Sequence, residues 1–193
     1  DVAPSRGLGD VYKRQGMIPA YCEGTKSARP AGKSKDAKET DIMADFVLSC
    51  CSTADLTKEH FQQRDISYIC FHYALDGVDY PDDLGETMPF DKFYAAMANG
   101  AETRTSQVNI SEFVDYFTPF LEQGKDILHV CLSSGLSGVS NSAENAARIV
   151  RERYPDRKIY IVDSLGASSG YGLLMDKLAD LRDEGMSIDA VRD

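Results

Sequence analysis

The sequence lacks a hydrophobic run long enough to cross a membrane, since a spanning helix needs about 20 apolar residues. Its longest apolar stretches, residues 66–75 and 127–132, have the length of strands and contain polar residues. It also lacks a basic excess, because 31 Asp and Glu outnumber 21 Lys and Arg, for a formal net charge of −10. We therefore expect no membrane span and no nucleic-acid partner, because an acidic chain repels phosphate groups.

Several motifs of common enzyme classes are missing. The sequence contains neither GxGxxG nor GxxxxGK[ST], the glycine-rich loops that bind nucleotide phosphates. The GLSG segment around Ser137 lacks the GxSxG spacing of a hydrolase nucleophile elbow. The three histidines, His60, His72 and His129, have no spacing typical of a metal cluster or a catalytic triad. We therefore predict no metal site, no cofactor and no catalytic residue.

Cysteines are few, odd in number and without a CxxC pair: Cys22, Cys50, Cys51, Cys70 and Cys131. The adjacent pair Cys50-Cys51 suits neither a zinc site nor an ordinary disulfide. Four of the five lie in apolar, strand-like surroundings. We expect small buried thiols in a reducing compartment, and hence a cytoplasmic protein.

Residues 1–42 differ from the rest of the chain. They show no sustained hydrophobic period, contain several Gly and Pro residues, and end in a segment rich in Lys, Ser and Ala. We interpret them as a disordered or non-native extension, with Met43 as the natural start. Residues 43–193 are expected to fold.

Strand and helix patterns alternate from residue 45 onward. Strands are predicted at residues 46–50, 66–75, 127–132 and 159–162, with a return strand at 78–80 after a turn at Asp76-Gly77. Helices are predicted at 57–64, 90–99, 109–123, 139–154 and 173–184, and another begins near Ser187. This order predicts a three-layer α/β/α domain with a mostly parallel sheet. The last helix has no partner in the sequence, so we expect a fragment whose second, C-terminal domain is missing.

Three loops rich in hydroxyl groups follow or end predicted strands: residues 51–55 (CSTAD), 105–107 (TSQ) and 133–138 (SSGLSG). Each alone is typical of capping and turn chemistry. Ligands of parallel sheets bind beyond the carboxyl ends of the strands, where such loops gather. Their hydroxyl and N–H groups would together form a neutral receptor for a carboxylate or phosphate.

These segments resemble the N-terminal part of the DegV family of bacterial fatty-acid-binding proteins. The family's TDSTADL is similar to residues 50–56 (CCSTADL), its TSQPS to 105–109 (TSQVN), its SSxLSGTYxSA to 133–143 (SSGLSGVSNSA) and its VDS to 162–164. At the opening motif the family's Asp is replaced by Cys51, so a role of that acid has no counterpart here.

The resemblance implies that the chain binds a long-chain fatty acid whose carboxylate is held by Thr105 and Ser134. Ser133, Ser106 and Ser52 are possible neighbours. It further implies a non-catalytic subunit that presents the acid to a partner such as a fatty acid kinase. In the family a larger C-terminal domain covers the acyl chain, and without it we expect weak binding.

Two other functions remain open on the sequence. A phosphotransferase or hydrolase could act through the same Ser-rich loop, with Ser134 or Asp163 in the reaction. Asp163 could equally be a cap of its own loop. A regulatory domain could instead use the same pocket as a lipid sensor. Turnover by the isolated protein would indicate the enzyme, and lipid-dependent capture of a partner would indicate the sensor.

Overall fold

The computed structural model describes residues 46–193, so the expectations for residues 1–42 and Met43 lie outside the described part. Its main sheet, sheet A, contains four parallel strands in the order β2-β1-β6-β7. Their bounds are Phe46–Cys51 for β1, Ile66–Ile69 for β2, Asp126–Cys131 for β6 and Ile159–Asp163 for β7. The central strands β1 and β6 are almost entirely buried, as their continuous apolar runs predict.

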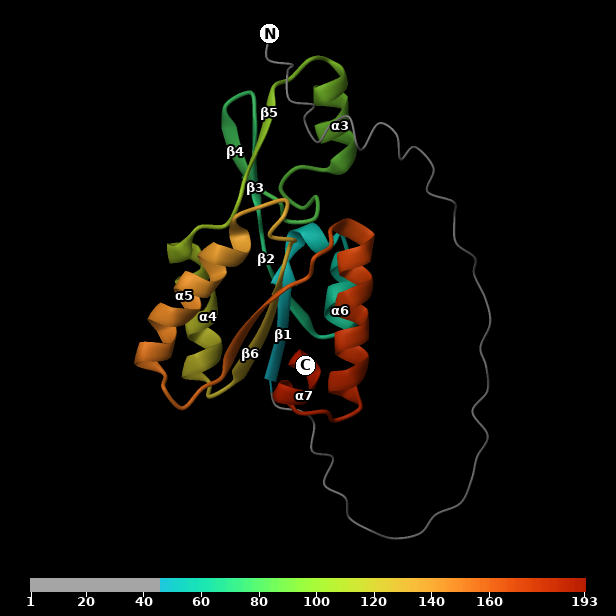
Figure 1. Cartoon of the computed structure of the whole chain (residues 1–193). Coiled ribbons are helices and arrows are strands. Elements are labelled where there is room, and N and C mark those ends of the chain that lie inside the picture. The colour runs from blue at the N-terminus through green and yellow to red at the C-terminus, as the bar shows by residue number, and fades with distance from the viewer. Residues whose placement is uncertain (1–45) are drawn as a thin grey trace, which may run out of the picture. The chain divides into compact units, whose positions relative to one another are not determined.

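Helices cover both faces of sheet A (Figure 1). On one face lie α4 (Ile110–Glu122) and α5 (Val139–Arg153), whose apolar sides pack on alternate residues of β1 such as Val47. On the other lie α2 (Lys58–Gln63), α6 (Ser168–Asp183) and α7 (Ile188–Arg192), which pack on the intervening residues such as Leu48. The predicted three-layer α/β/α architecture is therefore confirmed.

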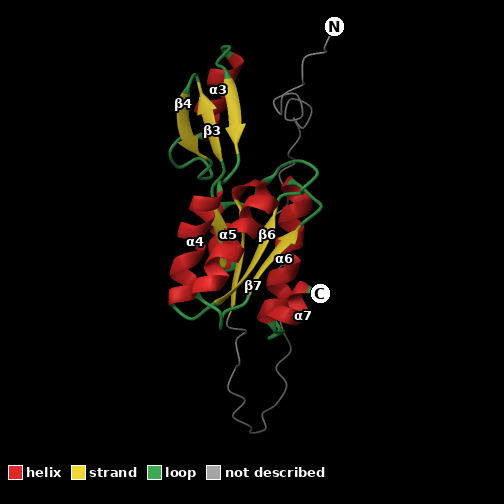
Figure 2. Cartoon of the chain, turned by 60° about the vertical axis from the view of Figure 1, so that its left-hand side comes forward, coloured by secondary structure: helices red, strands yellow, loops and turns green. Residues whose placement is uncertain are grey.

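A second, antiparallel sheet extends beyond the end of sheet A (Figure 2). Sheet B has the order β4-β3-β5, formed by His72–Leu75 (β3), Val78–Pro81 (β4) and Thr103–Ser106 (β5), and α3 (Phe90–Ala98) belongs to it. The predicted single strand at 66–75 is wrong, because it divides at Cys70-Phe71 between the two sheets. The N–H of Phe71 donates to Ser52 Oγ and its carbonyl accepts from Asp82, so neither group is available to a strand ladder.

Helix boundaries follow the sequence where a cap marks them. Thr57, Asn109 and Ser187 each accept a backbone N–H as N-cap, and Asn109 forms a full capping box with Glu112. The predicted start of α6 at residue 173 is wrong, because the helix begins at Ser168. The last helix, expected to have no partner, packs Ile188 and Val191 into the same apolar cluster as α6.

Within residues 46–193, no helix combines the length and apolar character that crossing a bilayer requires.

Candidate functional site

The loops at the carboxyl ends of β5 and β6 are joined by one side chain. Ser137 Oγ donates to Gln107 Oε1 at 2.9 Å, and Gln107 Nε2 donates to Ser142 Oγ at 3.3 Å. A Cβ atom at Gly138 would lie 3.2 Å from Gln107 Oε1, so the glycine leaves room for this contact. Gln107 therefore fixes the TSQ segment against the SSGLSG loop at the start of α5.

The SSGLSG loop is also joined to the loop that follows β7. The N–H of Ser133 donates to the Gly166 carbonyl at 3.1 Å, and the N–H of Ser134 donates to Asp163 Oδ1 at 3.1 Å. Within the loop, Ser133 Oγ accepts the N–H of Gly135 at 3.2 Å. Two of the three predicted hydroxyl-rich loops, TSQ and SSGLSG, thus form one continuous rim with the loop that follows β7.

Asp163 places a negative charge on this rim. The Ser134 side chain, followed by the N–H of Leu165, lowers the pKa of the Asp163 carboxyl below its ordinary value. An anionic ligand at Ser134 would therefore meet the charge of Asp163, whose Oδ1 accepts the Ser134 N–H.

Thr105 and Ser106 both lie on β5 with exposed side chains. In the antiparallel pairing Thr105 stands opposite Tyr73 and Ser106 opposite His72. Paired residues share a face of the sheet and successive residues alternate, so the two hydroxyls point to opposite faces. Thr105 and Ser134 stand two and three residues from the Gln107–Ser137 bridge. Their joint role as ligand-binding residues stays a prediction.

Ser52, the remaining predicted neighbour, is a buried connector. Its Oγ donates to Asp82 Oδ2 at 2.8 Å and accepts the N–H of Phe71 at 3.0 Å. These bonds join the end of β1 to both ends of the β3–β4 hairpin. Burial raises the pKa of the Asp82 carboxyl above its ordinary value, although the Ser52 hydroxyl opposes this shift.

Two contacts of this region were not anticipated from the sequence. No sequence pattern indicates that Gln107 bridges two loops, because its partner Ser137 lies 30 residues away in the chain. Ser168 has a left-handed φ of 50° at the start of α6, and its side chain opposes the rise that burial causes in the pKa of the Asp55 carboxyl. Here a signal exists: residues 166–170 read GASSG, the GxSxG spacing that the GLSG segment lacks.

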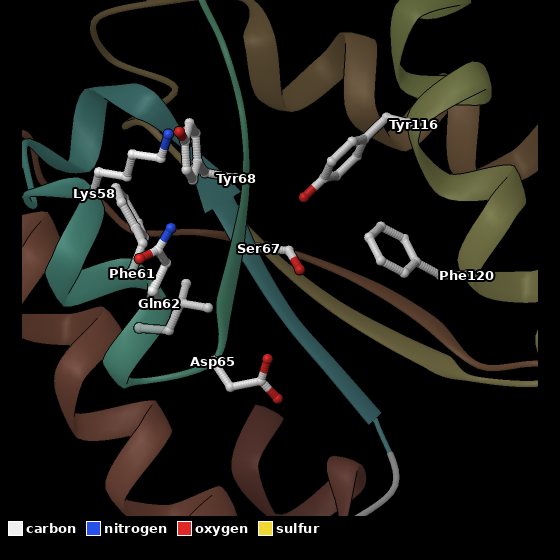
Figure 3. A pocket seen from close by; sticks show the side chains of 9 residues that line it. Lys58, Phe61, Gln62, Asp65, Ser67, Tyr68, Tyr116 and Phe120 are labelled. Carbon is white, nitrogen blue, oxygen red and sulfur yellow. The ribbon is translucent and has the colours of Figure 1, made fainter. Parts of the chain in front are cut away.

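A cavity of about 380 Å³ lies elsewhere, along the edge strand β2. Figure 3 shows side chains of α2, including Lys58 and Phe61, on one side of this strand and Tyr116 and Phe120 of α4 on the other. Ser67 of β2 stands between the two groups. The hollow follows the sheet edge and contains none of the predicted carboxylate-binding residues, so it is separate from the candidate site.

Comparison with known proteins gives a consistent family. A family model described as "Uncharacterised protein, DegV family" matches residues 50–193. The DegV domain-containing protein CPE0026 of Clostridium perfringens is 37% identical over 149 residues, which cover 77% of this chain and 51% of that protein. YteA of Lactococcus lactis, also a DegV domain-containing protein, is 33% identical over 144 residues, covering 74% and 50%. The chain spans about half the length of these relatives.

Solved structures share the fold. A stearic-acid-binding protein from Eubacterium ventriosum is 28% identical with a TM-score of 0.70, over 76% of this chain and 50% of that one. A DegV family protein from Thermus thermophilus, described by its fatty acid binding, is 28% identical with a TM-score of 0.66 over the same shares. The Streptococcus pneumoniae Fatty Acid Kinase B3 protein, loaded with linoleic acid, is 26% identical with a TM-score of 0.59, over 75% and 50%.

Proposed function

Because the chain belongs to the DegV family, we propose that it binds a long-chain fatty acid, with the carboxylate held by the hydroxyls of Thr105 and Ser134. The Gln107–Ser137 bond carries the proposal, since it joins the two segments that supply these hydroxyls. Ser133 is a neighbour in this site, whereas the hydroxyl of Ser106 points to the opposite face of β5. Three solved relatives of the same fold are fatty-acid-binding or fatty-acid-loaded proteins, which supports the ligand class.

The acyl chain and the carboxylate of such a ligand contribute differently to its binding free energy. Burial of about 14 methylenes contributes on the order of 11 kcal/mol before ordering and association costs, at about 0.8 kcal/mol each. A buried carboxylate without partners would cost several kcal/mol. Charge-assisted hydrogen bonds offset about 1.5–3 kcal/mol each, so the acyl chain supplies affinity and the hydroxyls supply selectivity for the acid.

The likeness to the Streptococcus pneumoniae Fatty Acid Kinase B3 protein supports a presenting role. We propose a non-catalytic subunit that offers the bound acid to a kinase, with a second domain covering the acyl chain. A cytoplasmic location belongs to the same proposal. The alternative, in which Ser134 or Asp163 takes part in a hydrolase or phosphotransferase reaction, predicts ester or ATP turnover by the isolated protein.

The direct test is calorimetry of Thr105→Ala, Ser134→Ala and the double variant with a long-chain fatty acid. We expect each single change to weaken binding by about tenfold or more, because each removes a bond to a charged group worth about 1.5–3 kcal/mol.

Thr103→Ala is the matched control, since Thr103 is exposed on the same strand and the same face as Thr105. Thr105→Ser, which keeps the hydroxyl, should retain most of the affinity. Unchanged affinity in the double variant would remove both residues from the site. Absence of any acyl species in solvent extracts of the purified protein would count against the ligand class itself.

A further inference from the structure

A row of buried polar side chains crosses the α4 side of sheet A. Tyr116 Oη lies 2.8 Å from Ser49 Oγ, which lies 2.9 Å from His129 Nδ1. His129 Nε2 in turn lies 3.8 Å from Cys51 Sγ. Ser49, Cys51 and His129 have no exposed surface. None of these groups belongs to the proposed carboxylate site, and apolar packing alone does not require a histidine between two hydrogen-bonding partners.

The row ends at a pair of thiols. Ser49 and His129 are register partners in the parallel pair β1–β6. Cys51 and Cys131 lie two residues further along each strand, so they face the same side and stand beside one another. Both thiols are free and buried. Neighbouring strands lie about 4.8 Å apart, within the Cα separations of about 4.4–6.8 Å that disulfides span.

The surroundings make the two thiols unequal. The neighbouring Cys131 thiol, together with His129, lowers the pKa of the Cys51 thiol despite its burial. The Cys51 thiol and burial in turn raise the pKa of Cys131. Cys70 is only partly buried, but its thiol is a weaker acid than that of Cys51. Partial burial, followed by the charge of Asp82, raises the pKa of the Cys70 thiol to about 11. A thiolate is the nucleophile in cysteine oxidation. Exposure alone would select Cys70, whereas the contact of Cys51 Sγ with His129 Nε2 and the lowered pKa of its thiol select Cys51.

We propose that Cys51 and Cys131 form a dithiol that hydrogen peroxide oxidises to an intramolecular disulfide. The Cys51 thiol passes its proton to His129 Nε2, while His129 Nδ1–H donates to Ser49 Oγ and Ser49 donates to Tyr116. The Cys51 sulfur then attacks one peroxide oxygen, the O–O bond breaks, and the proton on His129 completes the departing water. Cys131 attacks the resulting sulfenic sulfur, forming the S–S bond and releasing a second water.

Access to the pair needs only local opening. Cys51 and Cys131 are the last residues of their strands, and the segments that follow, η1 (Ser52–Ala54) and the SSGLSG loop, include partly exposed residues. Opening at strand ends requires less free energy than global unfolding. The proposal is independent of fatty acid binding.

The test is peptide mapping of the purified protein after treatment with hydrogen peroxide and blocking of the remaining thiols with N-ethylmaleimide. We expect, under non-reducing conditions, a peptide that joins Cys51 to Cys131, while Cys70 stays alkylated. Cys50→Ala should leave this cross-link intact. Oxidation of Cys70 without the cross-link, or a cross-link that uses Cys50 or Cys70, would overturn the proposal.

Two variants separate the steps. In Cys131→Ser we expect the Cys51 sulfenic acid to persist and to be trapped by dimedone. His129→Asn should slow cross-linking by at least about tenfold, because it removes the proton acceptor. His60→Asn, at a surface histidine that pairs with Asp176, is the matched control and should leave the rate unchanged. Circular dichroism checks the fold of each variant. If His129→Asn does not fold, the peptide map of the wild-type protein alone tests the proposal.

Discussion

At the scale of single residues, the charge of Asp163 opposes the ligand that its neighbour Ser134 is proposed to hold. The carboxylate accepts the N–H groups of Ser134 and Leu165. It therefore orders the rim and at the same time competes with an incoming anion. An amide at this position would keep an oxygen for the two N–H groups and remove the charge.

We expect Asp163→Asn to tighten fatty acid binding by up to about fivefold. Two unit charges about 4 Å apart in water-like surroundings repel by about 1 kcal/mol, which corresponds to that factor. Isothermal titration at neutral pH measures it. Asp156→Asn removes the same charge from an exposed residue before the start of β7 and should change nothing. Weaker binding by Asp163→Asn would show that the ordering role of the carboxylate is the larger one.

The pKa of the Asp82 carboxyl is shifted in the opposite direction to that of Asp163. Because burial raises the pKa of its carboxyl above the ordinary 3.8, the contribution of this group to stability is complete below pH 3.8 and is lost as the pH rises through the raised value. Asp82→Asn keeps an oxygen to accept the Ser52 hydroxyl. We therefore expect the variant to be more stable than the wild type at pH 7, with a gain that shrinks as the pH falls.

Urea denaturation across a pH series checks this expectation. Asp79→Asn, at an exposed residue of the same hairpin, is the control and should show no comparable pH-dependent gain. A constant difference between Asp82→Asn and the wild type at every pH would contradict the electrostatic explanation.

Residue types could be predicted from the sequence more reliably than residue partners. The TSQ and SSGLSG segments do lie together, although β5, which leads into TSQ, belongs to the antiparallel sheet B and not to the predicted parallel sheet. The partners of Ser52 could not be predicted, because Asp82 lies 30 residues away and reaches it only through the hairpin of sheet B. The same limit applies to Gln107, whose partner Ser137 also lies 30 residues away.

At the scale of elements, the packing of α6 on the end of β1 depends on a glycine. A Cβ atom at Gly172 would lie 2.7 Å from the Ala54 carbonyl oxygen and 3.0 Å from Leu56 Cδ2. Because the nearest atom belongs to the backbone, the clash cannot be relieved by turning one side chain. The close approach holds α6 against η1, beside the loop that contains Ser52 and Asp55.

We expect Gly172→Ala to destabilise the protein by about 1–3 kcal/mol, the usual range for overpacking a well-packed contact. Gly170→Ala is a matched control in the same helix, since a Cβ there meets nothing within 4 Å. That change should stabilise by about 0.5–1 kcal/mol, because alanine favours the helix more than glycine. Thermal unfolding of both variants measures the difference, and equal effects would exclude the steric explanation.

The same glycines explain one error of the sequence analysis. Gly170 and Gly172 lower the helix propensity of the first turns of α6, so the pattern predicts a loop up to residue 172. Tertiary packing reverses this preference. Where local chemistry fixes a boundary, as in the capping box of Asn109 and Glu112, sequence and structure agree.

At the scale of the whole molecule, the layered sheet and the hairpin that turns at Asp76-Gly77 were predicted, whereas the separation of this hairpin into a second sheet with β5 was not. Buried strands such as Asp126–Cys131 carry a continuous apolar run, which their position between two helical layers requires. Sheet B has no such core: no residue of α3 is buried, and Phe90 and Tyr94 remain 56% and 49% exposed. The helical spacing of these side chains predicted the helix, but it did not show how little of the helix would be covered.

The net charge of the chain, −10, makes it possible to distinguish a carboxylate site built from hydroxyl groups from one built from Lys or Arg. An acidic protein repels a fatty acid anion over distances that salt shortens, from about 30 Å at 0.01 M to about 10 Å at 0.1 M. We therefore expect binding to tighten by about two- to threefold as sodium chloride rises over this range, since screening removes repulsion. A site built from Lys or Arg would weaken instead.

Salt also drives any acyl chain out of water, so the acid must be compared with a fatty alcohol of the same length. The alcohol carries no charge, and its salt dependence measures the apolar part alone. We expect the excess tightening of the acid over the alcohol to shrink in Asp163→Asn, because that variant loses the charge nearest to the proposed carboxylate position. If acid and alcohol respond equally in the wild type, the carboxylate does not bind within the acidic field of this domain, and the Thr105–Ser134 site is wrong.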